Sequence, residues 1–362
     1  MSAVAAAPAV APPAPSPAFR LGRPFVHPLF DLMLIGGGLS LVVSAVLVSG
    51  GSSWIALGSG ASVVIVLLSN LAHFASSTVR LYSKPDAFRD YPFLTMGLPL
   101  ATLAVLTLFL LCADVAGRHL LSLYLTWSPF HYGAQAYGLA VMYSYRSGLQ
   151  LTTLDRRLIR TACLAPFVLI LVNGPGSGLP WLLPGITHMP ALEAARQGLA
   201  TVLYYAALAL PLAVFARSLA LKRSLPLISA LAIASNTVWL VVLLSRGAFW
   251  WAAVFHGLQY LAIVTIFHVR DRQRVAAQPV GWLWPTLSFY GMCVVLGYLL
   301  FKAWPYAFVM AGFGMAESML LVVATINIHH FIVDAFIWKL RRGSNYRTMT
   351  DAAAPAAAPA VA

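Results

Sequence analysis

Charged side chains are scarce in this sequence of 362 residues. Asp, Glu, Lys and Arg together make up 9% of the chain and hydrophobic residues 60%, whereas roughly 25% of the residues in an ordinary soluble domain are charged. This composition excludes a soluble globular protein. Stretches without any charged residue recur along the chain, and about 20 apolar residues suffice for a helix to cross a bilayer.

Cysteine is also rare. Cys112, Cys163 and Cys293 lie far apart within apolar stretches, which excludes both a disulfide framework and a CxxC metal site. No basic residue precedes Arg20, so the N-terminus does not resemble a secretory signal peptide. Because both ends are rich in Ala and Pro, we expect disordered tails at residues 1–24 and 343–362 around a single transmembrane domain at 25–342.

Polar breaks divide the apolar sequence into ten predicted transmembrane helices. Their approximate ranges are 29–49, 54–78, 93–113, 120–145, 159–174, 197–216, 225–245, 248–269, 281–301 and 316–338. If the segments between them alternate between two sides, 19 of the 23 Lys and Arg residues fall on one side. The positive-inside rule makes that side cytoplasmic. We therefore predict an all-α polytopic membrane bundle with both termini in the cytoplasm, located in the cytoplasmic membrane.

The formal net charge of +13 raises the question of a nucleic-acid partner. The basic residues are spread in short clusters between apolar stretches and form no single patch, which argues against nucleic-acid binding. The partners we expect are membrane lipids, an apolar small-molecule substrate and an electron-donor protein.

Polar side chains within the predicted helices gather in four of them. They are Asn70 and His73 in the second, His131, Gln135 and Tyr137 in the fourth, His256, Gln259 and Tyr260 in the eighth, and Asn327, His329, His330 and Asp334 in the tenth. Such groups are costly at membrane depth and mark functional sites. Counting about 1.5 Å per residue from the next cytoplasmic basic residue puts them in one layer, roughly 8 to 22 Å above the cytoplasmic edge. We hypothesise that the four helices converge at this layer.

Within these helices, the spacing pairs a histidine with a second polar group. His131 and Gln135 are four residues apart, as are His330 and Asp334, so the members of each pair share one helix face. A metal-bound imidazole usually donates its other N–H to such a partner. His329 is turned about 100° from His330, so it would serve a second ion or face a neighbouring helix.

The donor set is rich in imidazole and poor in thiolate and carboxylate, which favours Fe, Zn or Cu over Ca or Mg. The predicted metal ligands are His73, His131, His256, His329 and His330. The residues predicted to assist the chemistry, by positioning water or oxygen or by orienting a ligand, are Gln135, Gln259, Tyr137, Tyr260 and Asp334. An iron centre of one or two ions would bring dioxygen to an apolar substrate, so we expect a metal-dependent oxidoreductase that acts on a lipid.

Two other functions could use the same residues. His131 and His256 could ligate a b-type haem in an electron carrier, although a second stacked pair on the same helices is missing. The layer of His and Asp could also carry protons in a transporter, although paired broken helices are missing from the sequence. The HxxxH and HxxHH boxes of membrane desaturases and alkane hydroxylases do not occur.

Overall fold

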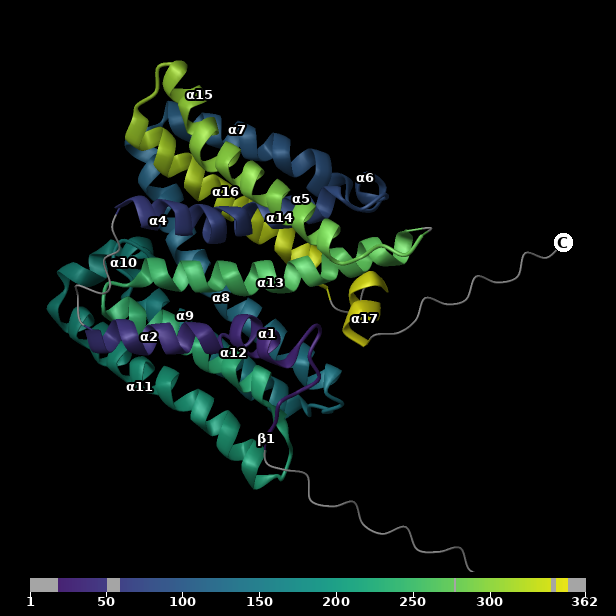
Figure 1. Cartoon of the computed structure of the whole chain (residues 1–362). Helices are drawn as coiled ribbons and strands as arrows, with labels where there is room; N and C mark the ends of the chain where they lie inside the picture. Colours follow the sequence, from purple (N-terminus) through teal and green to yellow (C-terminus); the bar gives the residue numbers. More distant parts are fainter. Residues whose placement is uncertain (1–18, 51–58, 277, 340–342, 351–362) are drawn as a thin grey trace, which may run out of the picture.

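The computed structural model describes residues 19–50, 59–276, 278–339 and 343–350, and within them the chain is almost entirely helical. Figure 1 shows long helices running side by side, with the N-terminal segment and α17 at the same end of the bundle. In chain order the elements are β1 (Phe19–Arg20), α1 (Pro28–Phe30), η1 (Asp31–Ile35), α2 (Gly38–Gly50), α4 (Ser59–Val66), η2 (Leu67–Leu71), α5 (Ala72–Tyr82), α6 (Ala87–Asp90), η3 (Phe93–Gly97), α7 (Leu98–Leu111), η4 (Ala113–Gly117), α8 (Arg118–Arg146), α9 (Thr153–Asn173), α10 (Gly178–Leu182), η5 (Pro184–His188), α11 (Pro190–Ala220), β2 (Leu225–Pro226), α12 (Leu227–Thr237), η6 (Val238–Leu243), α13 (Phe249–Val275), α14 (Leu283–Tyr298), η7 (Leu299–Ala303), α15 (Trp304–Met310), α16 (Met315–Ile337) and α17 (Gly343–Thr350).

Seven helices of the described residues are long and apolar enough to cross a membrane. They are Gly60–Tyr82, Phe93–Leu111, Thr153–Leu182, Pro190–Ala220, Phe249–Val275, Leu283–Met310 and Met315–Ile337. An eighth span results if the pair Pro28–Ile35 and Gly38–Gly50, which is bent by 48°, counts as one. The chain is thus an all-α bundle suited to a membrane, with fewer qualifying spans than the ten predicted.

The two remaining predicted spans coincide with helices outside that set. The stretch 225–245 contains Leu227–Leu243, which is apolar but shorter than a full span. The stretch 120–145 lies in α8, which has 29 residues but carries His131, Gln135 and several hydroxyl groups. The polar residues that make α8 a candidate for function therefore also lower its hydropathy.

Both ends of the described chain are folded, where the sequence predicts tails. Phe19–Arg20 pair in parallel with Leu225–Pro226. Gly343–Thr350 form α17, in which the amide oxygen of Asn345 accepts a hydrogen bond from Nη2 of Arg80 at 2.6 Å. Composition did not predict these elements because their partners lie on distant parts of the sequence. The other residues of the predicted tails, apart from 21–24, lie outside the described part of the chain.

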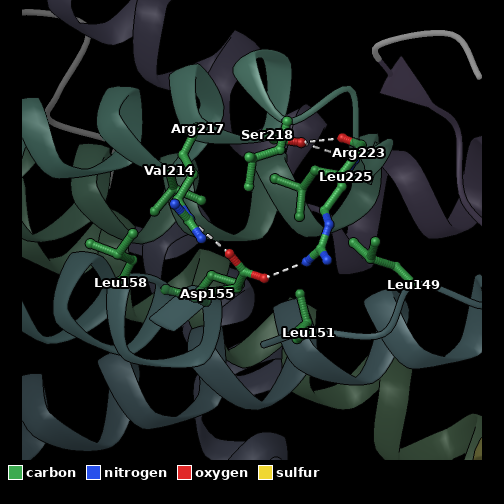
Figure 2. Close-up of a pocket in the computed structure, with 11 residues that line it drawn as sticks. Leu149, Leu151, Asp155, Leu158, Val214, Arg217, Ser218, Arg223 and Leu225 are labelled. Atoms are coloured by element: carbon green, nitrogen blue, oxygen red, sulfur yellow. Dashed lines mark hydrogen bonds and ion pairs between the residues drawn. The ribbon is translucent and has the colours of Figure 1, made fainter. Parts of the chain in front are cut away.

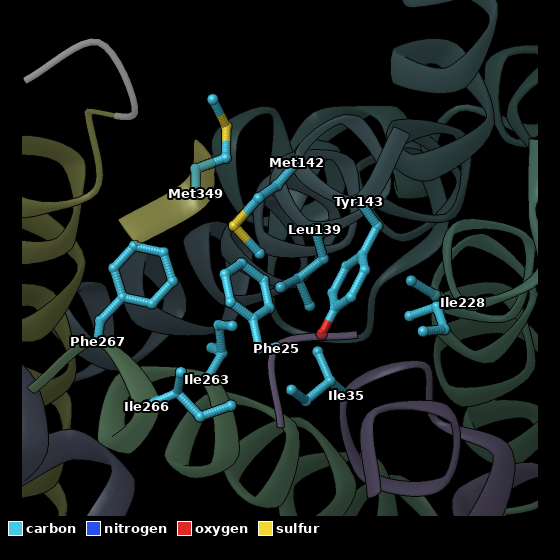
Figure 3. Packing of buried hydrophobic residues seen from close by; sticks show 11 residues of the cluster. Phe25, Ile35, Leu139, Met142, Tyr143, Ile228, Ile263, Ile266, Phe267 and Met349 are labelled. Carbon is cyan, nitrogen blue, oxygen red and sulfur yellow. The ribbon is translucent and has the colours of Figure 1, made fainter. Parts of the chain in front are cut away.

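The N-terminal segment is anchored by Phe25, which lies in a buried apolar cluster (Figure 3). The carboxylate of Asp31 accepts hydrogen bonds from the backbone N–H of Phe25 at 2.5 Å and from the hydroxyl of Tyr143 at 2.7 Å. The guanidinium of Arg146 lies 4.1 Å from the Phe25 ring centroid and donates to the carbonyl of Met349 at 2.9 Å. One buried arginine thus joins α8, the N-terminal segment and α17.

A charged cluster fastens α9 to α11 (Figure 2). Asp155 accepts hydrogen bonds from Nε of Arg217 at 2.8 Å and from Nη1 of Arg223 at 2.9 Å. Asp155 also completes a capping box with Thr152 at the start of α9, which satisfies backbone N–H groups at the helix N-terminus. The adjoining cavity measures about 30 Å³, which is close to the volume of one water molecule. We therefore assign this cluster a structural role.

Glycine lets the helices that carry histidine approach one another closely. A Cβ atom on Gly257 of α13 would lie 3.0 Å from the carbonyl oxygen of Ser69 in η2. On Gly297 of α14 it would lie 2.7 Å from the backbone of Leu71. Small residues are typical of such crossings in membrane proteins, because they allow backbones to come into contact. These crossings hold α13 and α14 against the segment that leads into α5.

Candidate metal centre

Four histidines from four different helices meet in the interior of the bundle. His73 lies on α5, His131 on α8, His256 on α13 and His330 on α16, and all four side chains are buried. The structure thus brings together four of the five predicted metal ligands. Their nitrogen atoms approach closely enough to form two candidate metal groups, one of His73, His131 and His256 and one of His131, His330 and Asp334.

The four imidazole rings pack against one another. Successive ring centroids are separated by 4.8 Å (His73 to His256), 5.1 Å (His256 to His131), 5.0 Å (His131 to His330) and 4.5 Å (His330 to His73). The diagonal from His73 to His131 is 6.3 Å. With a metal–nitrogen bond of about 2.1 Å, the ring centroid of a ligand lies about 3.2 Å from the ion. Neighbouring ring centroids would then be about 4.5 Å apart in a square arrangement of ligands and about 5.2 Å apart in a tetrahedral one. The observed separations of neighbouring rings lie within this range, and the ligand atoms fall into two groups that share His131, so the rings are spaced for one or two ions.

Most of the imidazole nitrogens of these four histidines have no hydrogen-bond partner among the described residues. Both nitrogens of His73 and of His256 are unpaired, and so is Nε2 of His131 and of His330. An unpaired polar atom is expensive in a membrane interior, where water is not available to solvate it. Buried imidazole nitrogens that lack hydrogen-bond partners and lie within 4.8 Å of one another are what an imidazole metal site requires.

Asp334 supplies a carboxylate next to the rings. Its Oδ2 lies 3.4 Å from Nε2 of His330 and 3.8 Å from Nε2 of His131. Its Oδ1 accepts a hydrogen bond from the hydroxyl of Tyr260 at 2.5 Å, and that hydroxyl in turn accepts one from Nε1 of Trp338 at 2.8 Å. The chain from Trp338 to Asp334 fixes the carboxylate, so Oδ2 is held toward the histidines.

Comparison with known proteins gives no relative for this arrangement. No protein-family model, no curated protein and no solved structure matches the chain. The chemistry of the centre therefore has to follow from its own geometry.

The predicted glutamines lie beside the centre and bond to each other. Nε2 of Gln135 donates to Oε1 of Gln259 at 2.8 Å, and Nε2 of Gln259 donates to the carbonyl of Ile35 at 2.8 Å. This bridge ties α8 to α13 and to η1. Gln135 also lines the cavity next to His131, so it remains placed to contact a bound molecule.

Two predicted residues lie away from the centre. Tyr137 packs against a separate apolar cluster that includes Ala140 and Ile159. His329 belongs to neither of the two candidate metal groups, as expected if it is turned away from the point that His330 faces.

Further residues that were not predicted also touch the histidines. The ring of Tyr132 stacks on His256 with centroids 3.8 Å apart and an interplanar angle of 9°. The hydroxyl of Ser77 lies 2.8 Å from Nδ1 of His330. Ser77 is four residues after His73, and this spacing on one helix face is the signal that could have identified it.

A cavity of about 320 Å³ opens beside the centre, and the residues of α8 that line it run from Trp127 to Met142, about 22 Å along the helix at the usual rise. Its wall includes His131, Tyr260 and Asp334, and the rest of its lining is mostly apolar or aromatic. A pocket of this size with a few convergent polar groups is typical of a small-molecule site. The centre thus has a chamber next to it that can hold an apolar molecule.

Proposed function

We propose that this protein is an integral membrane oxidoreductase in which the buried histidines bind iron and an apolar substrate occupies the adjoining cavity. The observation that carries the proposal is the set of unpaired imidazole nitrogens that form two overlapping groups next to that cavity. A purely structural layer would leave these nitrogens at a high desolvation cost.

The donor set supports iron. His131, His330 and Asp334 make up the combination of two histidines and one carboxylate that non-haem iron oxygenases use, with open positions left for other ligands. His73 and His256 would add imidazoles from the opposite side. Because His131 belongs to both groups, the simpler arrangement is one iron ion that uses His131. The alternative is a di-iron centre with one ion in each group. Zinc and copper accept imidazole equally well, so the metal itself has to be measured.

The residues around the centre have separate tasks in this proposal. The bound metal would supply a site for dioxygen, and Asp334 would be kept in position by Tyr260 and Trp338. In a hydroxylation, a substrate C–H bond and dioxygen give an alcohol and water. This reaction consumes two protons and two electrons, which an electron-donor protein would deliver.

A b-type haem is the weaker alternative. The 6.3 Å between the ring centroids of His73 and His131 would suit two axial ligands, but the rings of His256 and His330 lie beside that axis, within 5.1 Å of both. They occupy the plane in which a porphyrin would have to lie.

Elemental analysis combined with a visible spectrum tests the proposal. Protein purified in mild detergent should contain iron and show no haem Soret band. A Soret band would establish the haem alternative. Protein that binds no Fe, Zn or Cu at micromolar concentration would overturn the metal centre altogether.

We further propose that the protein lies in the cytoplasmic membrane, crosses it ten times and has both termini in the cytoplasm. The support is the distribution of 19 of 23 basic residues on one side and the helices that coincide with all ten predicted stretches. Reporter fusions at Ser344 and after Ser52 should report opposite sides. The same side for both fusions would refute the count.

A further inference from the structure

The cavity beside the centre runs between α8 and α16. Its walls come almost entirely from these two helices, with Tyr260 and Ile263 of α13 at its base. Trp127, Phe130 and Phe331 line the part farthest from the predicted cytoplasmic end, and His131 and Asp334 lie in the middle. An elongated chamber of this kind fits a chain better than a compact ring system.

Small residues border the gap between the two helices. Ala134 of α8 and Ala335 of α16 line the cavity and are exposed on the outer surface of the bundle. Gly138 also lines it, and a Cβ atom added there would meet nothing within 4 Å. If these exposed lining residues lie at membrane depth, the cavity would be open to the lipid phase here.

A single cation lies at the cytoplasmic end of the cavity. Lys339 is exposed, lines the cavity and has its Nζ 4.8 Å from the ring centroid of Phe336. Among the described residues no carboxylate forms an ion pair with Lys339. It follows Asp334 by five residues, or about 8 Å along the helix axis at the usual rise.

We infer that the substrate is a single-chain amphiphile with an anionic head group, a carboxylate or a phosphate. This inference rests on the proposed function and names its substrate class. The head group binds Lys339 at the membrane surface, the chain enters sideways between α8 and α16, and a carbon some distance from the head reaches His131 and Asp334. The length of the cavity and its apolar lining accommodate the chain, and Lys339 provides the charge.

Binding of brominated probes tests this inference without requiring catalysis. Dibrominated long-chain fatty acid, alkyl phosphate and fatty alcohol are added to protein in neutral phosphatidylcholine nanodiscs, and quenching of tryptophan fluorescence is followed. Trp127 and Trp338 line the cavity, so bound probes will quench them. We expect the two anionic probes to bind about five- to tenfold more tightly than the alcohol, as one partly desolvated ion pair allows. A difference between the acid and the phosphate identifies the preferred head group.

Lys339→Gln should abolish this preference for charge, whereas Lys222→Gln, an exposed lysine outside the cavity, should retain it. If Lys339→Gln still prefers the anionic probes, or if Lys222→Gln loses this preference to the same extent, Lys339 does not recognise the head group. Equal binding of all three probes to the wild type would overturn the inference in the same way.

Gly138→Leu should weaken binding of all three probes at least tenfold by filling the cavity. Gly291→Leu is the matched control, because a Cβ atom there also meets nothing within 4 Å and the residue does not line the cavity. Ala134→Leu provides a second obstruction if Gly138→Leu does not fold. Unchanged binding in both obstructed variants would show that the chain lies elsewhere. All measurements are repeated on protein stripped of metal with a chelator, so a failure of the metal centre is distinguished from a failure of this inference.

Discussion

Replacing His131 by Ala is the sharpest test of the metal centre, because His131 belongs to both candidate groups. Without it, His73 and His256 remain as one pair of donors, and His330 and Asp334 as another. We expect His131→Ala to retain no metal at micromolar concentration. His329→Ala is the control, because His329 is a neighbour of His330 in sequence yet belongs to neither group.

The expected change in stability on replacing His131 follows from two opposing effects on the metal-free protein. The variant loses the contact of the His131 ring with Phe331, whose centroids are 4.6 Å apart, and leaves a small void, which together cost about 1–3 kcal/mol. It also removes a buried Nε2 that has no partner, which returns about 1–3 kcal/mol. The metal-free variant and the metal-free wild type should therefore have similar stability. Metal at a thousand times its Kd stabilises only the wild type, by about 4 kcal/mol.

Thermal unfolding with and without a chelator measures this difference. For the wild type we expect the chelator to lower Tm by on the order of 5 °C, given the unfolding entropy of a chain of this size. His329→Ala should respond as the wild type does, and His131→Ala should show no response. If the chelator lowers the Tm of His131→Ala as much as that of the wild type, the imidazole is not a ligand and the reasoning is refuted.

Three other substitutions examine what surrounds the centre. Asp334→Asn should remove the carboxylate ligand of the group with His131 and His330 and lower metal affinity by more than about 100-fold in a binding titration, whereas a loss of only about 10- to 100-fold would show that the carboxylate orients His330 and is not a ligand. Gly257→Ala should destabilise the protein by about 1–3 kcal/mol in denaturant titrations, because its Cβ would press on the backbone of η2, whereas Gly291→Ala should leave stability unchanged. Asp31→Asn should cost about 1.5–3 kcal/mol by weakening charge-assisted hydrogen bonds, and limited proteolysis should then cleave the N-terminal segment faster; an unchanged cleavage rate would contradict the anchoring role of this carboxylate.

The depth of the four histidines could be predicted from the sequence, but their positions around the bundle could not. Depth depends on the number of residues to the helix end, which can be counted. The lateral arrangement depends on which helices touch, and this is decided by close crossings such as that of Gly257 on Ser69. Proximity of Asp334 to His131 is therefore a property of the fold, while its proximity to His330 follows from a spacing of four residues.

Helix geometry explains why some of the predicted residues lie away from the centre. Tyr137 follows His131 by six residues, which is about 600° of rotation and leaves it roughly 120° from the ligand face. Tyr260 follows His256 by four residues and faces the centre as expected. The folded C-terminal segment was missed for a different reason: Asn345 pairs with Arg80, 265 positions earlier in the chain, and composition carries no information about such a contact.

A purely structural role is costly for the histidine layer, although single buried polar atoms without a hydrogen-bond partner also occur elsewhere, as in Asn236, Thr237 and Ser318. Gln259 is paired at both its oxygen and its nitrogen, and Arg146 donates to several backbone carbonyls. Six nitrogens of the four histidines, clustered in one place, have no hydrogen-bond partner among the described residues. At about 1–3 kcal/mol each, such groups would cost about as much as the entire net stability of a typical protein, about 5–15 kcal/mol. If these residues only held the four helices together, Ser, Thr or Asn would be more suitable, because their side chains can form hydrogen bonds across a helix crossing. The imidazoles form two groups that share His131 and could hold a metal ion, and this is the arrangement on which the proposed function rests.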